Sequence, residues 1–220
     1  MKQYLPNKPH KWGFKLHVLC SLGGYAYKFE IYSGKQEHVR LLEEPDLGLV
    51  GNTVVRLCRS VPKNVNHILY FDNYYTALPL LHYLSTLGIH ALGTIQRNRL
   101  GKHCNLPTQT DFMKPSITRG TYEEQLTNYG TVTISVTCWK DNKLVTLAST
   151  YVGAEPVDNI KGFNEKNMKK ISITCPKIIK EYNARMGGVD LMDSFLGRYR
   201  ITIKSRKWYI RLFTMCRTWL

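Results

Sequence analysis

The sequence lacks the features of a membrane or secreted protein. No stretch approaches the roughly 20 consecutive apolar residues that cross a bilayer, and the first residues, MKQYLPNKPHKWG, contain no apolar signal core. The six cysteines are scattered singly, with no CxxC pair and no Cys/His cluster of zinc-ligand spacing. Most lie in apolar runs, as reduced core thiols do. We therefore expect a soluble intracellular protein with no membrane partner.

Acidic residues are also scarce. Lysine and arginine total 31 against 16 acids, a formal charge of +15, and neither residues 2–28 nor residues 194–220 contain any acid. This excess favours a polyanionic partner, most commonly nucleic acid, although a merely basic surface is the alternative. The 220 residues, 43% of them hydrophobic, are enough for one domain with an insertion or two small domains with a proper core.

The centre of the sequence predicts a strand, a helix and a second strand. Residues 68–71 form a short apolar run that ends at Asp72. A helix over residues 76–87 follows, with Thr76 as its cap and a glycine after it, and then a strand over residues 89–95. Such a unit implies a parallel pair and places Asp72 at the carboxyl end of a buried strand, where α/β sheets carry chemistry. The alternative is that Asp72 only caps the helix or makes an Asx turn.

The segments on either side predict a mixed sheet with helical cover. Residues 14–20 and 25–32 read as a hairpin around two glycines, and residues 52–60 as a short helix capped by Asn52. Residues 100–120 are loop-like and residues 151–170 read as a polar connector. Three strands are expected between them: 121–126, 131–139 and 143–149. We interpret them as a β-rich insertion, and a separate β subdomain would look the same.

The last fifth of the chain returns to helix. Residues 177–185 form one helix, two glycines interrupt it, and residues 189–196 form the next. Asp190 and Asp193 are three residues apart, so both carboxylates face the same way from its first turn. Acids also simply stabilise a helix N-terminus, which is the alternative. A final helix from Trp208 offers one apolar face and one charged face.

These stretches together are similar to the piggyBac-type transposases and the host genes derived from them. The resemblance covers almost the whole chain and rests on six motifs in the right order: PHKWGFK at 9–15, IYSGK at 31–35, FDNYYT at 71–76, GTIQRNR at 93–99, YNARMGGVDLMD at 182–193 and KSRKW at 204–208. It implies an α/β, RNase H-like mixed sheet flanked by helices, with a β-rich insertion. The expected parts are a first core segment 1–98, the insertion 99–149 and a last core segment 150–220 with a basic C-terminal helix.

The resemblance also implies cut-and-paste DNA transposition at TTAA sites with two Mg²⁺ ions held by aspartates. Paired divalent ions need several anionic oxygens from different elements. Matched by position, Asp72 is the second catalytic aspartate, Asp190 the third, and Asp193 an additional acid for the metal. The first position is Ser21, a neutral hydroxyl. Glu30 cannot replace it, because it lies about five residue pairs along the hairpin, roughly 15 Å away.

We therefore expect an incomplete metal site, impaired Mg²⁺ binding and lost catalysis. Two alternatives stay open: an active nuclease or transposase with a rebuilt site, and a co-opted interaction module or decayed gene product without nucleic-acid activity. DNA binding could persist through basic residues near the site: Lys8, Lys11, Arg97, Arg99, Lys204 and Lys207. The aromatic residues Tyr74, Tyr75 and Trp208 are expected in the core rather than as stacking platforms for bases.

The resemblance further predicts a nuclear protein. The family's N-terminal region for dimerisation and its C-terminal cysteine-rich zinc domain have no counterpart in the sequence. We therefore expect a decayed, captured or partial copy of the catalytic core, which would form a homodimer only if the missing N-terminal region is supplied elsewhere.

Overall fold

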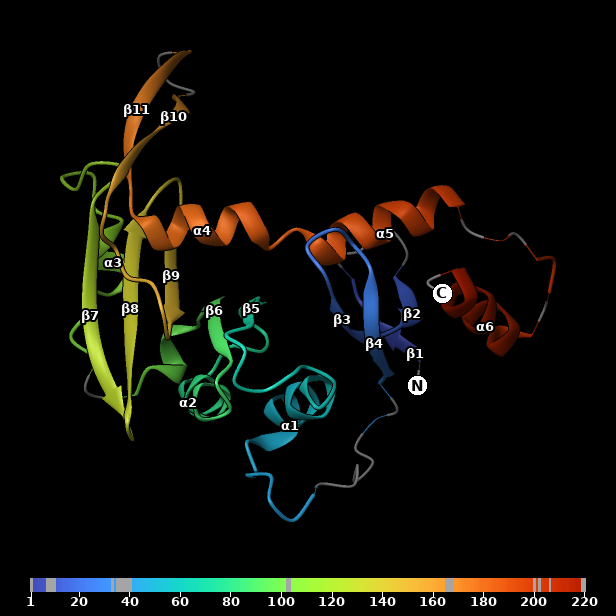
Figure 1. Cartoon of the computed structure of the whole chain (residues 1–220). Helices are drawn as coiled ribbons and strands as arrows, with labels where there is room; N and C mark the ends of the chain where they lie inside the picture. The colour runs from blue at the N-terminus through green and yellow to red at the C-terminus, as the bar shows by residue number, and fades with distance from the viewer. Residues whose placement is uncertain are drawn as a thin grey trace. The chain divides into compact units, whose positions relative to one another are not determined.

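The computed structural model describes residues 2–6, 11–32, 34, 41–101, 104–164, 168–199, 201, 203–205 and 207–218. Its helices and strands form two compact units, and each is described by itself. The first joins Met1–Val61 to Met186–Leu220, and the second is Pro62–Arg185. Both are mixed α/β, as expected (Figure 1). Across the described ranges, no helix is long and apolar enough to cross a bilayer.

The described residues of the first unit form two small antiparallel sheets and three helices. Its elements are β1 (Lys2–Tyr4), β2 (Trp12–Phe14), β3 (Leu16–Cys20), β4 (Ala26–Ile31), α1 (Gly48–Cys58), α5 (Gly188–Tyr199) and α6 (Trp208–Thr218). β1 pairs with β2, and β3 pairs with β4. The hairpin predicted around the glycine pair is confirmed: the Ser21 N–H donates to the Tyr25 carbonyl at 2.8 Å, and Gly24 has φ +81°.

Helix α1 begins earlier than predicted, and Asn52 is not its N-cap. Asn52 lies inside the helix, where its side chain accepts the Leu47 N–H at 2.9 Å and donates to Asp46 at 2.9 Å. Asp46 in turn accepts the Gly48 N–H at 3.1 Å. These side chains satisfy donors that the first turn of a helix leaves without a partner, so the helix can start at Gly48.

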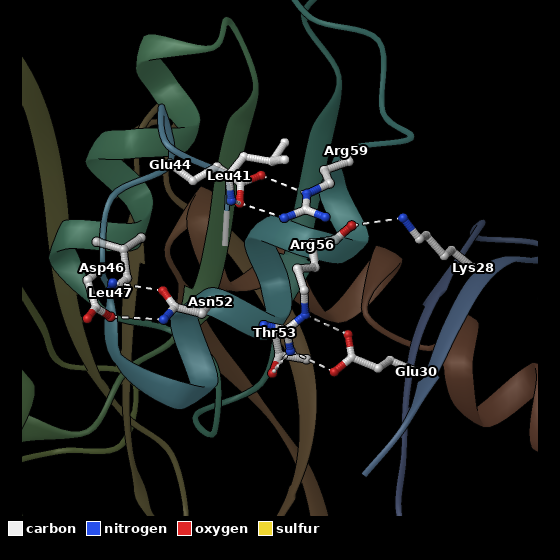
Figure 2. A network of polar contacts seen from close by, with 10 residues as sticks. All are labelled: Lys28, Glu30, Leu41, Glu44, Asp46, Leu47, Asn52, Thr53, Arg56 and Arg59. Carbon is white, nitrogen blue, oxygen red and sulfur yellow. Dashed lines mark hydrogen bonds and ion pairs between the residues drawn. The ribbon is translucent and has the colours of Figure 1, made fainter. Parts of the chain in front are cut away.

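Polar contacts tie α1 to the β3–β4 hairpin and to the loop before the helix (Figure 2). Arg56 makes two hydrogen bonds to the Glu30 carboxylate, at 2.9 and 2.6 Å, and Lys28 donates to the Arg56 carbonyl at 2.9 Å. One turn further along, Arg59 makes two bonds of 2.7 Å to Glu44. Paired, two-pronged bonds of this kind fix direction as well as distance.

The second unit is built on a five-stranded mixed sheet in the order β5-β6-β9-β8-β7. Its elements are β5 (Ile68–Phe71), α2 (Leu78–Thr86), β6 (His90–Thr94), η1 (Arg97–Arg99), α3 (Gln109–Phe112), β7 (Tyr122–Tyr129), β8 (Val132–Lys140), β9 (Leu144–Ser149), β10 (Asp158–Asn164), β11 (Lys169–Cys175) and α4 (Lys177–Arg185).

The predicted strand, helix, strand unit is confirmed. β5 and β6 are parallel, with Phe71 opposite Gly93, and the buried leucines of α2 pack beside them. Thr76, however, is not the helix cap, because the cap position falls at Ala77. Thr76 is instead fully buried and donates its hydroxyl hydrogen to the Asp72 carbonyl at 2.8 Å.

The three strands expected after residue 120 are present as β7, β8 and β9. β9 pairs antiparallel with β6, so these strands extend the sheet of β5 and β6. Two expectations were wrong. The loop-like stretch contains α3, whose Thr108 side chain caps it by accepting the Asp111 N–H, and the polar connector contains β10 and most of the β10–β11 ribbon. Long-range contacts, rather than local propensity, hold that ribbon in place.

Candidate functional site

Asp72 lies directly after β5 in the second unit, as the sequence predicted, and its backbone shapes the loop that follows. Its carbonyl accepts the N–H groups of Tyr75 and Thr76, both at 3.3 Å, besides the Thr76 hydroxyl. One carboxylate oxygen, Oδ1, accepts the Tyr74 N–H at 3.0 Å in an Asx turn. The Asx turn that was the alternative interpretation is therefore present. It engages one of the two carboxylate oxygens.

Arg99 holds the same loop from outside. Its Nη1 lies 3.1, 3.0 and 2.9 Å from the carbonyl oxygens of Asn73, Tyr74 and Thr76. Gly93 permits the close approach of the loop to β6, because a Cβ there would collide with the Thr76 hydroxyl and lie 2.9 Å from the Phe71 carbonyl oxygen. Two residues of the GTIQRNR motif thus fix the position of Asp72.

Besides burial, the negative charge of Asp72 contributes to raising the pKa of two tyrosines. Burial raises the pKa of Tyr75, and the negative charge of Asp72 adds to that rise. Burial also raises the pKa of Tyr182 on α4, with Asp72 again contributing, against a hydrogen bond to Thr94 at 3.4 Å that lowers it. Thr94 and Tyr182 belong to the sequence motifs, but no functional role was predicted for either residue. Their side chains meet near Asp72, so three separate motifs converge in the second unit.

The other candidate residues meet in the first unit, where the turn of the β3–β4 hairpin contacts the first turn of α5. A Cβ at Gly188 would collide with the Ser21 carbonyl oxygen and lie 3.2 Å from Cys20 Sγ. A Cβ at Gly24 would lie 3.1 Å from the Met192 backbone nitrogen. We call this contact, made by residues 20–24 and 188–192, the hairpin–helix junction. It brings Ser21 close to the helix that carries Asp190 and Asp193.

Ser21 has a structural role in the junction. Its hydroxyl accepts the Tyr25 N–H at 3.1 Å, and its carbonyl accepts the Gly24 N–H at 3.1 Å. Asp190 and Asp193 are both exposed on α5, and Asp193 adds to the burial effect that raises the pKa of the Cys20 thiol. The junction and the helix turn that continues from it therefore offer the carboxylates of Asp190 and Asp193 and one hydroxyl, that of Ser21, which already accepts a hydrogen bond.

This donor set does not fit a paired Mg²⁺ site, which needs more anionic oxygens than two carboxylates and an engaged hydroxyl supply. Among the residues with described positions, neither unit by itself gathers three His, Cys, Asp or Glu side chains into a metal-binding group. Asp72 belongs to the second unit and the junction to the first.

The basic candidates fall into two groups. Arg97 and Arg99 both bind loop carbonyls: Arg97 donates to Pro107 at 2.6 Å and also to Leu106. Lys11, Lys204 and Lys207 are exposed in the first unit, and the ring of Trp208 stacks on Phe14 with centroids 5.2 Å apart. Trp208 is nevertheless half exposed, so it is not the core residue that we expected. Lys8 lies outside the described residues.

The fold is similar to part of a solved transposase. In a solved piggyBac transposase synaptic complex with hairpin DNA, one chain matches 99% of this chain with a TM-score of 0.69 and 23% identity, over 41% of its own length. PiggyBac transposable element-derived protein 3 of Homo sapiens is 31% identical over 98% of this chain and 35% of its own length. PiggyBac transposable element-derived protein 2 of Homo sapiens is 27% identical over 94% and 34%.

The chain therefore spans about a third of the length of these curated relatives. A family model described as Transposase IS4 matches residues 1–219, nearly the whole sequence. The chain belongs to this transposase family, as a piggyBac-type, transposable element-derived protein.

Proposed function

We propose that this chain is a piggyBac-type catalytic core of the RNase H-like class that binds duplex DNA without cutting or joining it. Transposition at TTAA sites, Mg²⁺ dependence and a nuclear location are the properties of the lineage from which it derives. In this chain the binding of DNA persists and the metal-dependent chemistry is lost.

The observation that carries the proposal is Ser21. A neutral residue stands where the family motif has its first aspartate, and its backbone carbonyl lies against Gly188, at the start of the helix that carries Asp190 and Asp193. An aspartate there would add the negative charge that bridges two cations, and a hydroxyl adds none. The Ser21 hydroxyl accepts a hydrogen bond from the Tyr25 N–H, so the serine stabilises the turn without any metal.

DNA binding is supported by charge. The chain carries +15 overall, and the exposed lysines 11, 204 and 207 lie in one unit. If each of these three lysines neutralises one phosphate, they alone predict a roughly 40-fold loss of affinity when salt rises from about 50 to about 200 mM, and further phosphate contacts would increase that loss. Because phosphate contacts do not read bases, we expect little sequence preference.

One pair of experiments tests the two halves of the proposal. A fluorescent duplex titrated with the purified chain should bind at low salt and lose affinity as salt rises. The same chain incubated with Mg²⁺ or Mn²⁺ and a hairpin or nicked duplex should leave the DNA intact. Cleavage that disappears in Asp72→Ala and Asp190→Ala would show instead that the site has been rebuilt around Ser21.

Ser21→Asp tests the reason for the loss. An aspartate can accept the Tyr25 N–H as the serine does, so the turn should survive. The variant should bind Tb³⁺ or Mn²⁺ more tightly than the parent chain, measured by luminescence or calorimetry. Ser21→Asn, which keeps the size but not the charge, is the matched control. Equal metal affinity in the Asp and Asn variants would mean that Ser21 is not the missing position.

A further inference from the structure

The antiparallel ribbon of β10 and β11 stands apart from the five-stranded sheet in the pairing pattern. It joins Asp158–Asn164 to Lys169–Cys175 over seven residue pairs, none of them shared with the sheet. At about 3.3 Å per residue the ribbon is roughly 20 Å long. Figure 1 shows it projecting beyond the sheet of its own unit.

The base of the ribbon is fixed to the core. Ile173 and Cys175 are each 1% exposed and belong to the main hydrophobic cluster of the second unit. The indole N–H of Trp139 donates to the Thr174 carbonyl at 2.8 Å. Nearer the other end of the ribbon, Arg119 donates to the Phe163 carbonyl at 2.8 Å while its Nε makes an ion pair with Asp141 at 2.5 Å. The ribbon is therefore held in one position, which lowers the entropy that binding costs.

Its two faces differ in character. Directly opposite residues share a face, so the pairs Ile160–Ile173 and Gly162–Ile171 lie toward the core. The pairs Lys161–Ser172 and Phe163–Lys170 lie on the other face, and all four residues are exposed. The two paired strands contain one acid, Asp158, and it makes an ion pair with Lys180 at 2.5 Å.

We infer that this outer face of the ribbon is a contact surface for duplex DNA, a proposal that rests on the DNA binding proposed above. The major groove, about 12 Å wide, admits a two-stranded ribbon whose strands are about 4.8 Å apart. Lys161 and Lys170 come from different strands and are diagonal neighbours, about 7–8 Å apart, so their long side chains can reach separate phosphates. Ser172 can donate a hydrogen bond to a phosphate oxygen, and Phe163 can make an apolar contact with a thymine methyl group.

The test measures how the affinity of the full chain for a fluorescent duplex depends on salt. Lys161→Ala/Lys170→Ala should lower the slope of log affinity against log salt by about 1.8, because two phosphate contacts are lost. The matched control, Lys63→Ala/Lys114→Ala, removes the same charge from exposed lysines elsewhere in the second unit, and should change the slope by less than half as much. Lys161→Arg/Lys170→Arg should keep the parent slope.

The possible results distinguish a failure of the ribbon assignment from a failure of the proposed function. A ribbon variant whose slope equals that of the control, while the parent chain binds DNA, overturns the ribbon assignment alone and leaves the face to a protein partner. A parent chain that binds no duplex at low salt overturns the proposed function and the ribbon assignment together. Circular dichroism and thermal melting of all variants show whether each one is folded, so that a smaller salt dependence is not caused by unfolding.

Discussion

At the scale of single residues, Arg99 shows a basic side chain serving the protein's own backbone. Its Nη1 bonds to three carbonyls of one loop, those of Asn73, Tyr74 and Thr76, and so closes the turn that begins at Asp72. A guanidinium suits this role because its planar donors are fixed in direction, whereas an ammonium on a flexible stem is a point charge. Its basic charge predicted a phosphate contact for Arg99, but its partners in the structure are backbone carbonyl groups, which have no sequence signal.

Replacing Arg99 by alanine should therefore destabilise the chain by about 1–3 kcal/mol, since charged hydrogen bonds to partly buried carbonyls are lost. Urea denaturation measures the loss, and hydrogen exchange at Tyr74–Thr76 should speed up. Arg198→Ala, at an exposed arginine of the first unit, is the control and should stay within about 0.5 kcal/mol. A variant with unchanged exchange in that loop would remove the structural role.

The hairpin–helix junction makes a second prediction, with its own internal control. Gly188→Ala places a methyl group against the Ser21 carbonyl oxygen, and we expect about 1–3 kcal/mol of destabilisation. At the neighbouring Gly187 a Cβ meets nothing within 4 Å, so Gly187→Ala should change stability by less than about 0.5 kcal/mol. Thermal melting of both variants compares them, and equal effects would mean that the junction does not form.

At the scale of secondary-structure elements, α1 depends on charge pairing along one side. The hydrogen bonds from Arg59 are the main reason that the pKa of Glu44 lies below its usual value of 4.5. A carboxyl whose pKa is lower in the folded chain than in the unfolded chain stabilises the fold when it is ionised in both states. That contribution is full above pH 4.5 and is lost as the pH falls through the lower, folded value.

Glu44→Gln should accordingly cost stability at pH 7 and cost progressively less as the pH falls below 4.5. Denaturant unfolding of the parent and the variant at several pH values gives the difference directly. Glu43→Gln, at the exposed neighbouring residue, is the matched control. A Glu44 difference that stays constant with pH would contradict the pairing with Arg59.

How far the elements could be predicted depends on where their stabilising contacts lie. β5, α2 and β6 were predictable because a short apolar run, a leucine face and a closing glycine are all local signals. β10 was not, because its sequence, DNIKGFN, is polar and contains a glycine. Its strand conformation depends on pairing with β11 and on Arg119, which donates to the Phe163 carbonyl from 44 residues away along the chain.

The candidate site divides in the same way. Motif spacing predicted that Asp72 ends a strand and that Asp190 starts a helix, and both positions are confirmed as local structure. Their roles in catalysis, and the loss of function at Ser21, stay predictions. The contact between Gly188 and Ser21 joins residues 167 positions apart, so no local sequence pattern predicts it.

At the scale of the whole molecule, the reactivity of the cysteine thiols measures how well each unit is packed. Cys58 in the first unit and Cys138 and Cys175 in the second are buried, and burial raises the pKa of each. For Cys58 the pKa rises from 9.0 to about 12, which reduces its reactive thiolate roughly 1,000-fold near neutral pH. Cys104 is only half-buried.

Iodoacetamide labelling followed by peptide mapping should therefore modify Cys104 well before Cys58, Cys138 and Cys175 in the native chain. In urea the four rates should become similar, which serves as the control. Rapid native labelling of Cys58 would show that α1 does not pack as described, and rapid labelling of Cys138 would show the same for the sheet.

The first unit is assembled from both ends of the described chain, and this has a consequence for biosynthesis. Residues 1–61 leave the ribosome without residues 186–220, on which their glycine-lined turn must close. At about 5–20 residues per second, the wait lasts roughly 6–25 s, during which the second unit can be completed. The β3–β4 hairpin is thus synthesised well before the helix against which it packs, and its contacts with that helix can form only after this interval.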